Sequence, residues 1–150
     1  MATATIESQW NGKEVKIRGN RVVGKSAFEI GLIVEAQAKA LCPVDLGYLR
    51  SSITTQSFTQ GSAIEFVPSG EMTQAQYYKT VPEGFKPIAK PTDENEVLVG
   101  TAVFYAPYVE FGTIRSNAQP FLRPALDLVK GRTLTVLEQN GRFEFAEYLQ

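Results

Sequence analysis

The sequence contains no histidine and a single cysteine, Cys42. Without histidine, the chain lacks the commonest general base and the commonest metal-ligating side chain. This argues against most hydrolase, zinc-dependent and triad mechanisms. A lone cysteine excludes an intramolecular disulfide, and its neighbours Leu41 and Pro43 favour a buried, unreactive thiol.

The sequence also lacks a strong charge bias and any long apolar run. The net charge is -1 and charged residues make up 21% of the chain, so there is no basic field of the kind that binds nucleic acid. No stretch reaches the length of a membrane helix, and the first ten residues lack the basic start and apolar run of a signal peptide. We therefore expect a soluble protein that is made in the cytoplasm and has no membrane partner.

No nucleotide-binding glycine motif occurs, and the basic residues show only one local cluster. This cluster is opposed by Glu14 alone, and it favours a solvated face or a subunit contact over contacts with phosphates. Its members are Lys13, Lys16, Arg18, Arg21 and Lys25.

The first half of the chain predicts a strand and then a long helix. Residues 14–18 alternate polar and apolar, which indicates a strand ended by Gly19-Asn20. From residue 21 to residue 41 the apolar side chains recur at helical spacing, and Asn20 is a candidate cap. Pro43 ends this helix, while Gly24 and Gly31 indicate close packing against another element. The apolar stripe comprises Val23, Ala27, Ile30, Val34, Ala38 and Leu41.

The second half predicts strands, a long loop and a second helix. Residues 53–58 and 63–67 form a predicted hairpin that pairs with a strand over 96–102, and residues 68–95 form an extended, exposed loop or arm. A short helical turn over 104–111 is closed by Gly112. Pro120 and Pro124 flank the start of a helix that is interrupted at Gly131 and ends at Gly141. Its apolar face is predicted to comprise Leu122, Leu126, Val129, Leu134 and Leu137.

Residues 143–148 are predicted to form a last strand or an apolar strap. The order of elements predicts one α+β domain over residues 1–150. In this domain an antiparallel sheet of about four strands packs against the long N-terminal helix and the second, C-terminal helix.

Two carboxylates lie in the most constrained stretches of the sequence, Asp45 and Glu110. Brought together, they could act as acid and base or hold a metal ion, but no ligand spacing supports this. Simpler roles are backbone hydrogen bonds for Asp45 and an ion pair or a turn cap for Glu110.

Three aromatic side chains, Tyr105, Tyr108 and Phe111, stand at three-residue steps and share one face of a helical turn. Both core packing and a subunit interface are consistent with this spacing.

Three blocks, in this order, resemble a family of bacteriophage proteins. The first is Ala-Leu-Cys-Pro-Val-Asp-Leu-Gly-Tyr-Leu-Arg-Ser-Ser-Ile at residues 40–53, with Leu46 where the pattern usually has threonine. The second is Val-Gly-Thr at residues 99–101 followed by Tyr-Ala-Pro-Tyr-Val-Glu-Phe-Gly-Thr at residues 105–113. The third is Ala-Gln-Pro-Phe-Leu-Arg-Pro-Ala-Leu at residues 118–126. Together they are similar to the tail-completion or minor tail-component family of long-tailed phages, whose members join head to tail.

The resemblance implies a structural role for the motif residues, with Tyr105, Phe111 and Phe121 holding the scaffold. It implies no catalytic residue, no metal and no cofactor. The motif residues are Pro43, Asp45, Gly47, Leu49, Arg50, Tyr105, Tyr108, Glu110, Phe111, Gly112, Thr113, Pro120, Phe121, Arg123 and Pro124.

The resemblance also implies a non-enzymatic virion protein at the phage neck. Its partners would be the head connector and tail tube proteins, and copies would form a ring, with a hexamer favoured, through which DNA passes without specific binding. Other classes stay open at this stage, namely a tail terminator, a minor capsid protein, or a small enzyme that uses Asp45 and Glu110.

Overall fold

The computed structural model describes residues 11–43, 47–58, 91–101 and 103–146. Its elements are α1 (Gly12–Leu41), α2 (Tyr48–Ser52), β1 (Thr54–Ser57), β2 (Val97–Gly100), α4 (Ala106–Phe111), α5 (Leu122–Lys130) and α6 (Thr133–Glu144). The strands pair antiparallel, with Thr54 opposite Gly100 and Ser57 opposite Val97. The protein is therefore a mixed α+β structure with a long N-terminal helix and a small antiparallel sheet.

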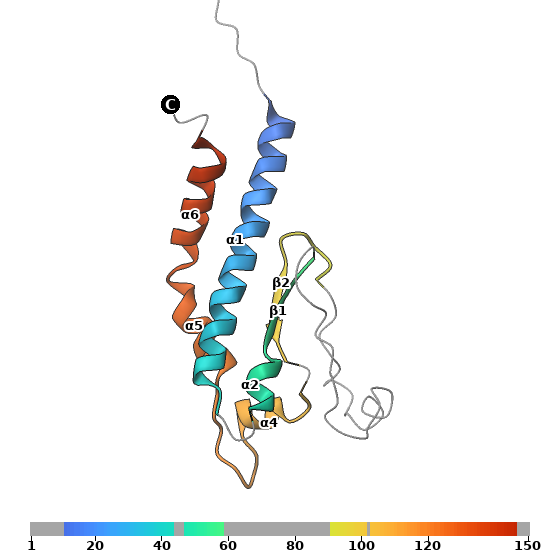
Figure 1. The fold of residues 1–150 in the computed structure, drawn as a ribbon, viewed down its shortest axis with the longest axis vertical. Helices are drawn as coiled ribbons and strands as arrows, with labels where there is room; N and C mark the ends of the chain where they lie inside the picture. Colours follow the sequence, from blue (N-terminus) through green and yellow to red (C-terminus); the bar gives the residue numbers. More distant parts are fainter. Residues whose placement is uncertain (1–10, 44–46, 59–90, 102, 147–150) are drawn as a thin grey trace, which may run out of the picture.

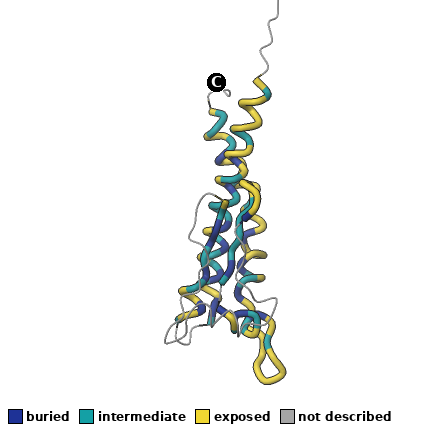
Figure 2. The backbone as a smooth tube through the Cα atoms, turned by 90° about the vertical axis from the view of Figure 1, so that its right-hand side faces the viewer, coloured by how far each residue is buried: buried dark blue, intermediate teal, exposed yellow. Residues whose placement is uncertain are grey.

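Helix α1 is the axis of an elongated molecule. It lies in the middle, with α5 and α6 along one side and the two strands along the other (Figure 1). The helices α2 and α4 and the connection between α4 and α5 gather at one end. Burial is concentrated along the middle of the molecule, and both ends carry exposed residues (Figure 2).

The sheet packs directly on Gly31 of α1. The Thr55 hydroxyl donates a hydrogen bond of 3.1 Å to the Gly31 carbonyl oxygen. A Cβ atom at position 31 would lie 2.6 Å from Val97 Cγ1 and 2.7 Å from Thr55 Cγ2. At Gly24 it would lie 3.0 Å from the Glu94 carbonyl oxygen. The prediction that both glycines mark close packing is confirmed.

A buried polar group sets the register between α1 and α6. The Asn140 side-chain amide on α6 donates to Ser26 Oγ at 3.1 Å and to Glu29 Oε2 at 2.8 Å, both on α1. Because an unpaired buried amide would cost about 1–3 kcal/mol, this pairing disfavours a shift of one helix along the other.

The strand predicted over residues 14–18 is wrong, because α1 begins at Gly12 and continues through Gly19 and Asn20. In a helix Arg18 reaches back to Glu14, with Arg18 Nη2 2.8 Å from Glu14 Oε1. Among the described residues no strand lies beside this segment. The alternating Val15 and Ile17 remain 42% and 61% exposed, so they contribute little burial to decide the conformation.

The sheet has two strands in the part of the chain that the structure describes, where about four were expected. Residues 63–67 and most of the predicted arm over 68–95 lie outside the described residues. The end of α1 before Pro43 and the turn of α4 closed by Gly112 are confirmed.

The C-terminal helix is interrupted at Gly131 as predicted, which divides it into α5 and α6. It differs from its prediction in other respects, because α6 continues past Gly141 to Glu144. Phe143 therefore lies on a helix, and Phe145 is the capping residue after it instead of part of a strand. Ala125 and Val129 face the core of the described structure, which leaves much of Leu126 and Leu134 exposed.

The packing at Gly31 yields a paired prediction. Gly31→Ala gains about 1 kcal/mol of helix propensity but crowds two β-branched side chains, which costs about 1–3 kcal/mol, so we expect a net loss of stability. Gly19→Ala is the matched control, because nothing lies within 4 Å of the added methyl group. It should raise the free energy of unfolding by up to about 1 kcal/mol. Urea denaturation followed by circular dichroism measures both, and equal stabilisation would contradict the packing.

Candidate functional site

The candidate site is the junction of α4 and α5, where the three sequence blocks meet. The first block contributes Leu49 and Ile53 to the core, the second contributes Ala106, and the third contributes Phe121 and Ala125. Phe121 and Ile53 are both completely buried. Segments that are far apart in the sequence are therefore joined by one apolar cluster at one end of α1.

Glu110 caps the start of α5. Its Oε2 atom accepts hydrogen bonds from the backbone N–H groups of Phe121 (2.8 Å) and Leu122 (3.0 Å). Its Oε1 atom accepts one from the N–H of Arg123 at 3.0 Å. The carboxylate thus satisfies three donors that the first turn of a helix leaves unpaired, and its charge complements the helix dipole.

The capping geometry also positions Arg123 and Phe111. The Arg123 guanidinium lies 4.4 Å from the centroid of the Phe111 ring, a cation–π contact. Phe111 is nevertheless 58% exposed, so any contribution it makes to holding the scaffold comes from this surface contact and not from burial in the core. Phe121 does fill the core, and Tyr105 packs against it.

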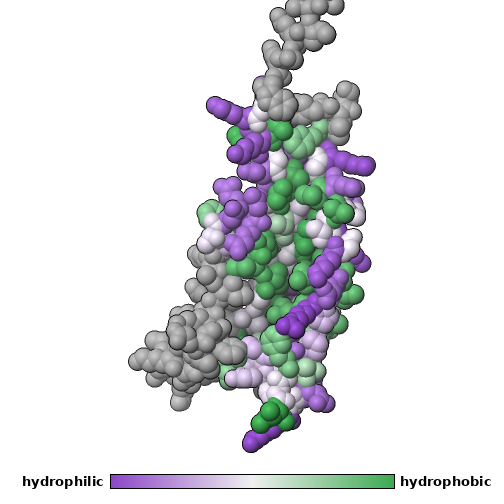
Figure 3. All heavy atoms as spheres, turned by 180° about the vertical axis from the view of Figure 1, so that it is seen from behind, coloured by the Kyte–Doolittle hydropathy of each residue, from purple (hydrophilic) through white to green (hydrophobic). Residues whose placement is uncertain are grey.

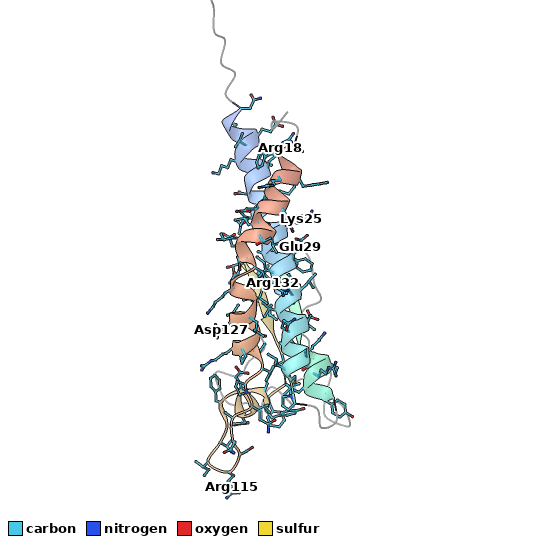
Figure 4. The ribbon with its side chains drawn as sticks, turned by 90° about the vertical axis from the view of Figure 1, so that its left-hand side faces the viewer. Arg18, Lys25, Glu29, Arg115, Asp127 and Arg132 are labelled. Atoms are coloured by element: carbon cyan, nitrogen blue, oxygen red, sulfur yellow. The ribbon has the colours of Figure 1, made fainter. Side chains whose placement is uncertain are left out.

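The connection between α4 and α5 is a well-defined turn. Gly112 has φ of 76°, which favours glycine, and a Cβ atom there would lie 2.7 Å from the Ala118 backbone nitrogen. The Thr113 N–H donates to the Ser116 carbonyl at 2.8 Å, and the Gln119 N–H donates to the Val109 carbonyl at 2.8 Å. Residues 113–116 are thereby held away from the body of the molecule, and Arg115 marks this far end in Figure 4.

The other motif residues divide into buried and exposed positions. Leu49 is buried, Gly47 has φ of 78°, and Pro43 and Pro124 are partly exposed. The exposed members are Arg50, Tyr108, Thr113, Pro120 and Arg123. Asp45 lies outside the described residues, so its distance from Glu110 stays untested.

Cys42 is buried, as expected, and burial raises the pKa of its thiol more than the charge of Arg50 lowers it. A raised pKa keeps the group protonated and unreactive at neutral pH.

The basic cluster on α1 is largely paired within the chain. Arg18 bonds Glu14, Arg21 Nη1 lies 3.1 Å from Glu144 Oε1, and Lys25 Nζ lies 5.4 Å from the centroid of the Phe143 ring. Arg21 and Lys25 thus contact α6, although the cluster was expected to be a solvated face or a subunit contact. Lys13 and Lys16 are exposed.

Several large apolar side chains at this end of the molecule are exposed, which the helical pattern alone did not predict. We call them the basal surface, and they are contributed by the end of α1, the start of α2, and the α4 region with its following turn (Figure 1). The basal surface comprises Leu41, Tyr48, Phe104, Tyr108, Phe111 and Ile114.

In the described parts of the chain, no group of three or more histidine, cysteine, aspartate or glutamate side chains is arranged to hold a metal ion. Within the same residues, no helix has the length and apolar character needed to cross a membrane.

Residues 9–112 match the model of a family described as "Bacteriophage HK97-gp10, putative tail-component". The match covers more than half of the chain and includes α1, α2, both strands and α4, with the capping residue Glu110. Neither a curated protein nor a solved structure matches the chain.

The Glu110 cap yields the second prediction. Glu110→Ala leaves three backbone N–H groups without their acceptor and should lower the free energy of unfolding by about 3 kcal/mol. Glu110→Gln keeps one acceptor oxygen and should cost about 1–2 kcal/mol. Glu138→Ala, an exposed position on α6, is the control and should change stability by less than about 0.5 kcal/mol. Equal stability of the Glu110→Ala and Glu138→Ala proteins in urea would refute the capping role.

Proposed function

This chain belongs to the HK97-gp10-like family of bacteriophage tail components, and we propose that it joins the phage tail to the head or completes the tail. A tail component is a structural protein of the virion that associates with other tail proteins. The finer proposal is that copies of the chain form a ring, with a hexamer favoured, around the DNA channel at the neck. There the ring contacts the head connector and the tail tube and performs no catalysis.

The observation that carries this proposal is the basal surface. Tyr48 is 53% exposed, Phe104 49%, and Tyr108 44%, and all three lie at the same end of the molecule as the projecting turn. Large exposed aromatic side chains are enriched in protein–protein interfaces, where they supply much of the binding energy. Such a surface is expected of a protein whose exposed aromatic side chains become buried against partner proteins on assembly.

The face of the molecule that is turned away from the viewer in Figure 1 supports the same proposal. Apolar side chains form a band along its long axis between hydrophilic flanks (Figure 3). The C-terminal helices also carry exposed leucines, with Leu128 60% exposed on α5 and Leu134 70% exposed on α6. Contiguous exposed apolar surface is typical of subunits that assemble.

Binding to tail tubes tests the proposal. The purified chain should sediment with tail tubes or with head connectors, and Tyr48→Asp or Tyr108→Asp should weaken this binding by at least about tenfold, because each places a charge in the interface. Gln139→Asp, at an exposed polar position of α6 away from the basal surface, is the control and should bind as the unmodified chain does. If the chain binds neither structure, and normal virions form without it, the neck assignment is wrong.

A further inference from the structure

The side chain of Ile114 is held in solvent by a rigid turn. Ile114 is 101% exposed, although its turn is closed by the Thr113–Ser116 backbone pair and by a hydrogen bond of 3.0 Å from the Ser116 N–H to Thr113 Oγ1. An apolar side chain that is ordered and fully exposed adds nothing to the stability of the isolated chain. It is pre-organised to enter a pocket on another molecule, because little entropy is lost when it binds.

A matching apolar groove lies on the side of the molecule. It has a volume of about 570 Å³ and runs between β2 and α5, with α1 as its floor. Its apolar lining includes Ile30, Val34, Val97, Val99, Leu122 and Leu126. Leu126 is 48% exposed in this groove, so an incoming apolar side chain would remove it from water.

The charge at the tip is opposite to the charge at one end of the groove. Arg123 also lines the groove, but its guanidinium is held over the Phe111 ring. Arg115 follows Ile114 at the tip of the turn, and no ion pair of its guanidinium with another described residue is present. Asn95 lines the groove, and the exposed carboxylates of Asp93 and Glu94 immediately precede it. An isoleucine that enters the groove would bring its neighbouring arginine toward this acidic turn.

The geometry points to a contact between two copies of this chain, in which the Ile114–Arg115 tip of one copy inserts into the β2–α5 groove of the next. The turn cannot serve its own groove, because the Gln119–Val109 hydrogen bond and the Glu110 cap fix its base. The contact joins two different surfaces. A copy that has inserted its tip therefore still has a free groove, and a copy whose groove is filled still has a free tip. Such head-to-tail contacts close into rings when the rotation between copies permits it. This inference rests on the ring in the proposed function and identifies the surfaces that build it.

Engineered disulfides test the contact. The double variant Ile114→Cys/Leu126→Cys should form a ladder of cross-linked dimers, trimers and larger species under mild oxidation. Either single variant should give no ladder, and a mixture of the two single variants should give heterodimers only. The native Cys42 is 4% exposed and does not interfere. A Gln139→Cys/Ile114→Cys variant is the matched control, with the second cysteine at an exposed polar position of α6 away from the groove.

A charge exchange supplies an independent readout. Arg115→Glu and Glu94→Arg should each weaken self-association by about three- to fivefold, and the double variant should recover it. Sedimentation velocity at chain concentrations up to about 1 mM measures these changes even for a weak contact. Arg115 and Glu94 are both exposed, so the fold should be retained, and circular dichroism checks this.

The contact is overturned if the Ile114→Cys/Leu126→Cys variant gives no ladder at about 1 mM, or if the Gln139→Cys/Ile114→Cys control cross-links as efficiently. Failure of the Arg115→Glu/Glu94→Arg double variant to regain self-association also counts against the contact. These failures are separable from failure of the proposed function, because binding to tail tubes is measured on the unmodified chain. A chain that binds tails but never cross-links through this pair retains its neck role and loses this contact.

Discussion

The carboxylate of Glu110 fixes the arrangement of the functional end of the molecule. By accepting hydrogen bonds from the N–H groups of residues 121, 122 and 123, it ties the last turn of α4 to the first turn of α5. Phe121 can then be buried without leaving its backbone N–H unpaired. Because residues 110 and 121 are held together, the residues between them must loop outward. The positive φ of Gly112 and the Gln119–Val109 hydrogen bond set the direction of this loop. One buried interaction thus determines where Ile114 is presented.

Local chemistry made several features predictable from the sequence. Pro43 prevents α1 from continuing, Gly112 ends α4, and the small residues Gly24 and Gly31 reveal that another element packs closely on α1. Alternation over residues 14–18 was misleading, since period-two patterning indicates a strand only when a neighbouring strand is present to pair with it. In this segment the ion pair between Glu14 and Arg18 and the contacts of α1 with α6 favour the helix over a strand.

The site could be predicted in part. The sequence favours either an ion pair or a turn cap for Glu110. In the structure its carboxylate caps the start of α5, and the donors lie 11 to 13 residues away, a distance that no local rule predicts. The exposure of the leucines of α5 depends on which face of that helix meets α1. This orientation follows from the fit of Ala125 and Val129 against α1, and apolar spacing alone does not distinguish a core face from a face reserved for a neighbour.

Under the proposed function, the chain reaches its full burial only within an assembly at the phage neck. The most direct measurement is electron cryo-microscopy of tails that contain the chain, compared with tails assembled without it. We expect additional density in a ring at the head-proximal end of the tail, with contacts between neighbouring copies and with Tyr48, Phe104 and Tyr108 against the tail or the connector. Tails that lack such density, or copies of the chain scattered along the tail without contacts to one another, would contradict the account.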